Sequence, residues 1–209
     1  MRTLSKKIFS QQIRFKNNKD HEFPDWKIKK LGNVCEIIGG GTPETNKSEY
    51  WNGEIQWFTP TEIKSNYVSK SERTITLLGL KNSSAKILPE GTILLTTRAT
   101  IGEVAIALEE CTTNQGFQSL IAKGSYNNIF IFNWIKNIKN ELIKRANGST
   151  FPEISKSEIQ NIEISIPSAH EQLLIANFFS LIDKKIETEK AILKLYEARK
   201  KYLLTNLFI

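Results

Sequence analysis

Residues 168–209, SAHEQLLIANFFSLIDKKIETEKAILKLYEARKKYLLTNLFI, contain neither proline nor glycine and directly follow Pro167. Ser168 and Glu171 have the S-x-x-E spacing of a capping box, in which each side chain accepts a hydrogen bond from the backbone of the other residue. Because nothing interrupts this stretch, the sequence predicts one helix over 168–209, about 60 Å long at 1.5 Å per residue.

Apolar residues recur along this helix in alternating steps of three and four, the spacing of a coiled-coil seam. The seam consists of Phe179, Ile182, Ile186, Leu193, Tyr196, Leu203 and Leu207. Glu189 and Lys200 share it, and polar residues there usually select register or partner. A single stripe on so long a helix requires a partner helix, from a second copy or from another protein. The alternative is a C-terminal helix packed on its own domain, which fits only the wider apolar face near its start.

Composition indicates a soluble globular protein, with 40% hydrophobic and 24% charged residues. No apolar run approaches the roughly 20 residues that a membrane span needs. Lys6, Lys7 and Arg14 interrupt the N-terminus, so we expect no signal peptide. Cys35 and Cys111 are too few for a disulfide framework and are predicted to be reduced thiols. These features predict a cytoplasmic protein without a membrane partner.

The net charge of +7 is concentrated at the N-terminus, where residues 1–32 hold nine Lys/Arg against three Asp/Glu. A basic arm is compatible with phosphate contacts to nucleic acid, although a solvated leader has the same composition. Apolar spacing in residues 2–15 is helical, and the L-x-x-x-[I/L]-F pattern beginning at Leu4 recurs at Leu203. Residues 1–23 are therefore predicted to be a basic segment resembling the tail of a preceding helix, with 17–24 as a linker.

Residues 24–167 are predicted to form a mixed α and β domain. Short strands are expected at 34–38, 55–58, 73–77, 91–97, 103–108, 117–122 and 162–166. A helix is expected over 128–145, with a short helical turn opened by a capping box from Ser155 to Glu158. Loops are expected at 39–43, 98–102, 112–116 and 147–150. The fold class is thus α+β, followed by the long helix.

The sequence gives little support for a catalytic or metal site. Gly39-Gly40-Gly41 lacks the spacing of a phosphate-binding loop and predicts a flexible turn. His21 and His170 have no ligand partners at a suitable spacing, so no metal is expected.

One enzymatic alternative stays open. Asp25 and Glu62, followed by Lys64, imitate the acidic pair and lysine of Mg²⁺-dependent nucleases. Thr59 and Glu62, however, also have capping-box spacing, which would occupy this carboxylate. The nuclease hypothesis predicts Mg²⁺-dependent cleavage that Glu62→Ala abolishes.

The predicted loops suit DNA readout better than catalysis. Asn114 and Gln115 carry amides able to pair with adenine, and Arg98 can pair with guanine. Phosphate contacts are predicted for basic and hydroxyl side chains of the same domain. These are Lys64, Arg73, Lys81, Lys86, Thr96, Thr97, Ser149 and Thr150. For each of them alone, a solvated loop side chain is an equally good interpretation.

Many short blocks together resemble the specificity subunits of type I restriction-modification systems. The blocks are Lys30-Leu31-Gly32, Gly40-Gly41-Thr42-Pro43, Tyr50-Trp51-Asn52-Gly53, Ile55-Gln56-Trp57, Gly79-Leu80-Lys81-Asn82-Ser83-Ser84-Ala85, Thr97-Arg98-Ala99-Thr100-Ile101-Gly102-Glu103, Thr113-Asn114-Gln115-Gly116-Phe117, Gly148-Ser149-Thr150-Phe151 and Pro167 through Glu171-Gln172 to Ile175-Ala176. So many blocks in one order cover essentially the whole chain and are far more specific than any single motif.

The resemblance implies a target recognition domain at 24–167 and a spacer and dimerisation helix at 168–209. In that family the helix packs antiparallel on its counterpart and docks methyltransferase subunits. Two recognition domains in tandem are usual there, whereas this chain has one. We therefore expect a half-subunit, or the C-terminal half of a longer one, in which two copies pair through their helices and read an interrupted palindrome.

The sequence thus predicts a non-catalytic reader of double-stranded DNA. Methyltransferase and restriction/translocase subunits, together with a second copy, are the expected partners. No cofactor is expected on the chain itself, and S-adenosylmethionine should bind the methyltransferase subunit. A rival class is a coiled-coil architectural protein, which would show no preference among DNA sequences.

Overall fold

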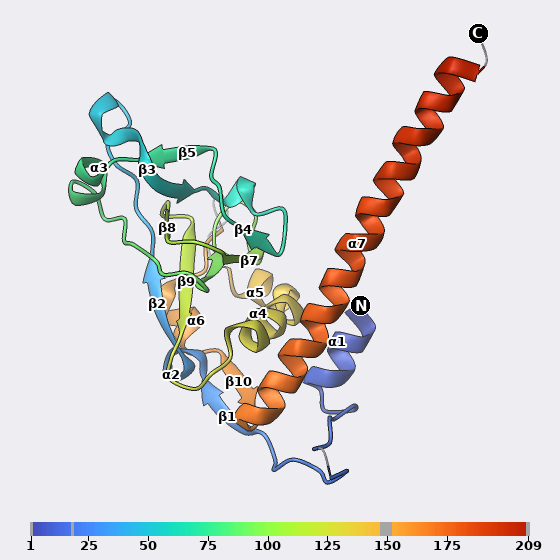
Figure 1. The fold of residues 1–209 in the computed structure, drawn as a ribbon. Helices are drawn as coiled ribbons and strands as arrows, with labels where there is room; N and C mark the ends of the chain where they lie inside the picture. The colour runs from blue at the N-terminus through green and yellow to red at the C-terminus, as the bar shows by residue number, and fades with distance from the viewer. Residues whose placement is uncertain (1, 18, 147–151, 208–209) are drawn as a thin grey trace.

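A computed structural model of the protein describes residues 2–17, 19–146 and 152–207 (Figure 1). The helices are α1 (Arg2–Phe9), α2 (Leu31–Val34), α3 (Leu77–Lys81), α4 (Asn128–Asn137), α5 (Lys139–Arg145), α6 (Lys156–Gln160) and α7 (Ala169–Leu207), with 3-10 turns η1 (Ser48–Tyr50) and η2 (Pro60–Glu62). The strands are β1 (Lys27–Lys30), β2 (Cys35–Gly39), β3 (Trp51–Phe58), β4 (Tyr67–Val68), β5 (Arg73–Ile75), β6 (Ile93–Thr96), β7 (Val104–Ala107), β8 (Cys111–Thr113), β9 (Phe117–Ala122) and β10 (Glu163–Ile166). The α+β prediction is confirmed.

A five-stranded sheet of order β2-β9-β6-β7-β4 forms the centre of the domain. Its pairs are antiparallel except for the β4–β7 edge pair, which is parallel. Every residue of β6 is buried, so this strand is covered on both faces. Because successive side chains point to opposite faces, Ile93 and Leu95 join the core beneath α4, whereas Leu94 joins a second core with Phe58 and Phe117.

A smaller sheet of order β5-β3-β8 lies beside the central one and carries α3 at its outer end (Figure 1). Strand β3 pairs antiparallel with β5 and parallel with β8. Trp51, Trp57 and Ile75 form its core, with the two indole rings edge to face at 5.0 Å between centroids. Aromatic pairs in this geometry add to the stability gained from burial.

Helix α7 leaves the domain from the two-stranded β1–β10 sheet and projects well beyond it (Figure 1). Its first part packs on α4 and beside α1, where Phe179 stacks on Phe9 at 5.8 Å between ring centroids. Asp183 is the last buried residue of α7 among the side chains that the structure describes. None of the described helices combines the length and apolar content needed to cross a membrane.

Most predicted elements are found, with shifted ends, and six short elements were not predicted. The Glu171 amide donates to the Ser168 hydroxyl at 3.3 Å, so the first half of the predicted cap is confirmed. The single helix expected over 128–145 was wrong, because the backbone departs from helical geometry at Ile138 and divides it into α4 and α5. The elements that were not predicted have fewer than six residues each and show no clear periodicity. They are β1, β4, β8, α2, α3 and η1.

Candidate DNA interface

The loops expected to read DNA are joined to one another by backbone hydrogen bonds. The Thr97 amide donates to the Gly116 carbonyl at 2.8 Å, and the Asn114 amide donates to the Phe58 carbonyl at 3.0 Å. The Gly41 amide donates to the Thr113 carbonyl at 2.8 Å, which adds the 39–43 loop. Four segments that are distant in sequence therefore form one surface, with little freedom to move independently.

Gly40 and Gly41 allow close backbone packing, so the prediction that Gly39-Gly40-Gly41 forms a flexible turn was wrong. A Cβ on Gly40 would lie 2.0 Å from the Asn114 carbonyl oxygen, and one on Gly41 would lie 2.3 Å from the Ala85 nitrogen. Both distances are far below any tolerated contact, so only glycine lets these backbones approach. The Trp57 indole N–H donates to the Gly41 carbonyl at 2.8 Å and fixes the loop further.

Arg98 lies at the turn between β6 and β7, where it is exposed to solvent, as a side chain that contacts DNA has to be. Its side chain is 46% exposed, and the guanidinium pairs with the Glu153 carboxylate at 2.7 Å. The next residue, Ala99, has φ of 57°, a left-handed conformation that is costly for a residue with a Cβ and that clusters at functional sites. Glu153 was not predicted, because only the tertiary fold brings it to Arg98.

Asn114 and Gln115 lie beside this turn, but their amides are already engaged. The Asn114 Oδ1 accepts from the Gly116 amide at 2.8 Å, and the Gln115 Oε1 accepts from the Thr42 hydroxyl at 2.5 Å. A bidentate contact to adenine uses both the oxygen and the nitrogen of an amide. Asn114 therefore holds its loop in shape in this conformation, whereas Gln115 is exposed and needs only to release Thr42.

Two of the predicted phosphate contacts were wrong because their side chains are buried. Thr96 and Thr97 have 0% exposure. Their hydroxyls donate to backbone carbonyls, from Thr96 to Thr100 at 2.5 Å and from Thr97 to Gly116 at 3.2 Å. These threonines shape the Arg98 turn from inside. Ser149 and Thr150 lie outside the described residues.

The predicted basic contacts are all exposed but lie on different parts of the domain. Lys64 follows η2, and Lys86 follows Ala85, which packs on Gly41. Lys81 ends α3 on the smaller sheet. The Arg73 guanidinium lies 3.6 Å from the Trp51 ring centroid, a cation–π contact that holds the exposed charge in one place.

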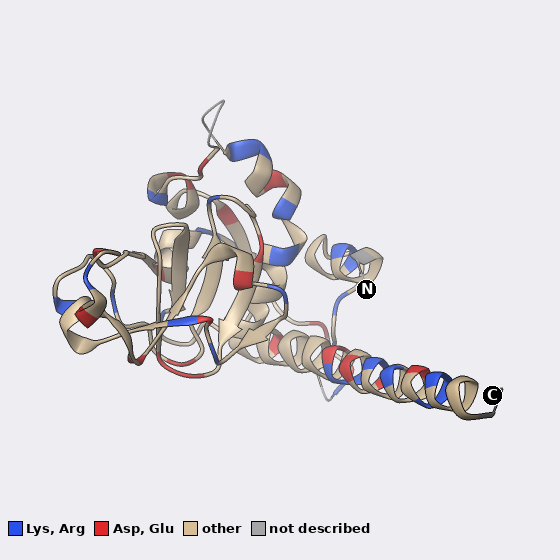
Figure 2. Ribbon diagram, turned by 90° about the horizontal axis from the view of Figure 1, so that it is seen from above, with Lys and Arg blue, Asp and Glu red and all other residues tan. Residues whose placement is uncertain are grey.

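Charge on the domain is not gathered into one basic patch. Lys and Arg are interspersed with Asp and Glu over the head, which is the globular domain of residues 24–167, and along α7 (Figure 2). Residues 24–167 contain 16 Lys/Arg against 15 Asp/Glu. The overall basic balance therefore comes from the two ends of the chain, and DNA contact by the head has to depend on a few positioned cations.

The nuclease alternative has no geometric support. Both oxygens of the Glu62 carboxylate are used, because Oε2 accepts from Thr59 and Oε1 accepts from the Glu72 amide at 2.7 Å. Asp25 instead lies 3.8 Å from Arg14 near the base of α7. Within the described residues, no three His, Cys, Asp or Glu side chains are grouped as metal ligands would be.

The base of α7 is tied to the head by buried polar contacts. Glu171 has 0% exposure, and its carboxylate accepts from Arg14 and from the Trp26 indole N–H, both at 3.1 Å. Its neighbour Gln172 accepts from the Asn127 amide at 2.9 Å. The reciprocal half of the predicted capping box is therefore replaced by contacts to the N-terminal segment and to the domain.

The predicted seam divides into a buried and an exposed part. Phe179 is 1% exposed and packs within its own domain, so its assignment to an intermolecular seam was wrong. Ile182 and Ile186 are partly covered, and Leu193, Tyr196 and Leu203 are 57%, 65% and 39% exposed. An almost entirely apolar groove runs along α7 from Ile182 to Leu193. The Leu207 side chain lies outside the described part.

Comparison with known proteins gives matches that cover both the globular domain and most of α7. The family model described as the type I restriction modification DNA specificity domain matches residues 24–197. The chain belongs to this family. The MjaIX specificity subunit of a type I restriction enzyme from Methanocaldococcus jannaschii is 40% identical over 207 residues, which cover 96% of this chain and 48% of that protein. The EcoR124I/EcoR124II specificity subunit from Escherichia coli is 28% identical over 76% of this chain and 41% of its own length.

Solved structures of specificity subunits share the fold. The HsdS subunit from Thermoanaerobacter tengcongensis superposes with a TM-score of 0.67 at 20% identity, over 91% of this chain and 45% of that one. The S subunit from M. genitalium gives a TM-score of 0.64 at 18% identity, over 94% and 48%. The chain thus spans about half the length of the specificity subunits it matches.

Proposed function

We propose that this chain is a DNA sequence-recognition subunit that directs partner methyltransferase and restriction subunits to a bipartite site. The observation that carries the proposal is the joining of three loops and the end of β3 into one surface, in a domain whose family is described by DNA specificity. Exposed Arg98 and Gln115 lie on that surface and are the primary candidates for base contacts. Arg73, Lys64 and Lys86 would hold phosphates.

The long helix supplies the second half of the proposal. Two copies pairing through the exposed seam of α7 would place two recognition domains at a fixed separation about a twofold axis. Each domain would then read one half-site of an interrupted palindrome. Helix length would set the gap between half-sites, as with any rigid spacer.

Catalysis would belong to the partners. A methyltransferase subunit would bind S-adenosylmethionine and transfer the methyl group, and a restriction/translocase subunit would cleave. This chain would recognise the DNA sequence and take no part in the chemical steps.

The test is co-purification with a methyltransferase subunit, followed by mapping of methylated adenines across genomic DNA. We expect a single bipartite motif with two related halves. A complex that methylates adenines without sequence preference, or a chain that binds no methyltransferase subunit, would refute the proposal. The rival architectural hypothesis predicts equal binding to all DNA sequences at every salt concentration.

A further inference from the structure

A second polar junction joins α7 to the head, separate from the one at Glu171. The Asn66 carboxamide lies between two charged groups, because its Nδ2 donates to the Asp183 carboxylate at 2.9 Å and its Oδ1 accepts from the Lys136 ammonium at 2.8 Å. Asp183 is 6% exposed, and Lys136 is partly buried on α4. One carboxamide thus connects three elements: the β3–β4 connection, α4 and α7.

The carboxamide suits this place for a chemical reason. It offers a donor to the carboxylate and an acceptor to the ammonium, whereas any charged side chain would repel one of them. Burial raises the pKa of the Asp183 carboxyl and lowers that of Lys136, while each charge opposes the shift of the other. Buried polar groups of this kind are costly unless every partner is in place, so the junction tolerates only a narrow range of geometries.

The junction is fixed firmly to the recognition domain. The Asn66 carbonyl accepts from the Ile106 amide of β7 at 2.9 Å, and Tyr67 continues directly into edge strand β4. Asn66 also follows η2 and Lys64 by only a few residues. Through Asn66, Asp183 is therefore held against the same part of the head that carries the proposed DNA-reading loops.

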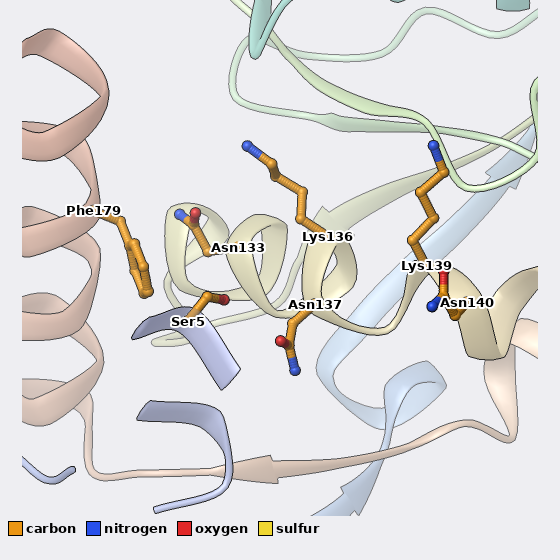
Figure 3. A pocket seen from close by; sticks show the side chains of 7 residues that line it. All are labelled: Ser5, Asn133, Lys136, Asn137, Lys139, Asn140 and Phe179. Carbon is orange, nitrogen blue, oxygen red and sulfur yellow. The ribbon is translucent and has the colours of Figure 1, made fainter. Parts of the chain in front are cut away.

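Figure 3 shows a pocket beside Lys136, one of the three residues of this junction. Phe179 reaches from α7 toward Asn133 and Ser5, while Lys136 extends from α4 toward the loops of the head. These residues line a cavity of about 370 Å³ between α1, α4 and α7. Apart from Phe179 this lining is polar, so on this side of α4 polar contacts such as the Asn66 bridge take part in fixing the direction of the helix.

We propose that Asn66, bridging Lys136 and Asp183, is a positioning residue that sets the angle between the recognition domain and the spacer helix. The direction of α7, taken as a rigid rod, is determined by two points at which it is held to the rest of the protein. These points are Glu171 and, about three turns further along, Asp183. Leu207 lies about 54 Å beyond Glu171 at 1.5 Å per residue. A tilt of about 10° at the junction therefore displaces the tip by roughly 9 Å, close to the length of three base pairs.

The test measures this angle without DNA. Spin labels on cysteines introduced at Glu54→Cys of the head and Glu197→Cys of the projecting helix report one distance by pulsed dipolar spectroscopy. Both sites are exposed. Burial raises the pKa of the native Cys35 and Cys111 thiols to about 12, so they react poorly with the label. Dilution with unlabelled protein restricts the signal to distances within one chain.

Asn66→Asp places a second carboxylate against Asp183. We expect the distance distribution to shift and to become at least twofold broader. The double variant Asn66→Asp with Asp183→Asn exchanges the carboxylate and the carboxamide, so Lys136 and residue 183 both regain a partner, and we expect the original distribution to return. Thr188→Ala is the control, since that hydroxyl bonds only within α7, to the Lys184 carbonyl. If Asn66→Asp fails to fold, Asn66→Ser removes the bridge without adding charge and should also broaden the distribution.

An unchanged distribution in Asn66→Asp, or in Asn66→Ser, would overturn the inference. Failure of the exchanged pair to restore the distance would overturn it too, because the effect would then be general damage rather than loss of the bridge. The link to site spacing rests on the proposed function, and its readout is the gap between methylated half-sites in the assembled complex. Absence of methylation would refute the proposed function and leave the distance result intact.

Discussion

At the scale of single residues, the proposed interface depends on side chains held ready by neighbours that do not themselves face DNA. Arg98 is positioned by a turn whose interior hydroxyls, on Thr96 and Thr97, are fully used by the backbone. Its ion pair with Glu153 is partly exposed to solvent, so the pair contributes little to stability. Its effect is to orient the guanidinium.

If Arg98 makes the proposed bidentate contact to guanine, Arg98→Ala is expected to weaken specific DNA binding by about 1–3 kcal/mol, because that contact is lost. Fluorescence anisotropy with target and scrambled duplexes measures the difference. Lys156→Ala, an exposed cation of α6, is the matched control and should leave discrimination unchanged. Equal discrimination in Arg98→Ala and the wild type would make Arg98 part of the scaffold.

Asp183 gives a prediction about pH. Burial raises the pKa of its carboxyl above the ordinary 3.8, against the opposing effects of Lys136 and Asn66. The folded state therefore binds this proton more tightly than the unfolded state, and the stability from this group is lost as pH rises through the folded pKa. The free energy of unfolding of the wild type, minus that of Asp183→Asn, should therefore fall as the pH rises through the mildly acidic range above the ordinary pKa of 3.8.

Urea unfolding at each pH measures this difference. Glu187 faces Asp183 along α7 and raises its pKa further, so the series should be repeated in a Glu187→Gln background. Tyr67 also faces the site, but its pKa is raised by burial and by Asp183, and it stays neutral in this range. A difference that stays constant or grows with pH would contradict the raised pKa.

At the scale of elements, α7 has a first part that is packed on the domain and a second part that projects into solvent. Up to Asp183 it is a core helix, with Glu171, Ile175 and Phe179 buried. Beyond Asp183 it is exposed on nearly all sides within the described residues. Helices in proteins owe most of their stability to tertiary packing, so we expect the projecting part to bind a partner along its apolar groove.

Leu193→Glu is expected to convert a dimer into a monomer, because a charge at the centre of the exposed seam cannot be buried without a counter-ion. Light scattering and sedimentation velocity over a range of concentrations measure the mass. Thr188→Glu, which adds the same charge away from the seam, should leave the dimer intact. A wild-type chain that is strictly monomeric at working concentrations would refute the pairing of two copies.

At the scale of the whole molecule, DNA affinity has to arise from a head that is not itself basic. Its 16 Lys/Arg are nearly balanced by 15 Asp/Glu over residues 24–167. Non-specific binding comes from released counterions and scales with the number of neutralised phosphates. A head of this composition should bind random DNA weakly and depend on a small number of phosphate contacts.

Lys64→Ala and Lys86→Ala are each expected to reduce the slope of log affinity against log salt by about one. They should weaken binding to target and non-target duplexes alike, since phosphate contacts carry no sequence information. Titrations at several salt concentrations give the slope, with Lys123→Ala as a control far from the proposed loops. A variant with an unchanged slope would exclude that lysine from the phosphate contacts.

The sequence by itself determined the features that are local. The uninterrupted run after Pro167 predicted α7, the Ser168 and Ser155 caps are present, and strands such as β6 and β9 lie where short apolar runs between turn residues placed them. The family, too, follows from short blocks in a fixed order. Each of these depends on neighbours within a few residues, which the sequence displays directly.

Only the tertiary structure decided which predicted site residues face solvent and which are already engaged. The hydroxyls of Thr96 and Thr97 suggested phosphate contacts, yet both side chains are buried beneath segments that are distant in sequence. Glu153 and Asn66 became interesting only through partners dozens of residues away, Arg98 and Asp183. The physical reason is that burial and charge pairing depend on long-range packing, whereas periodicity and capping depend on the local chain.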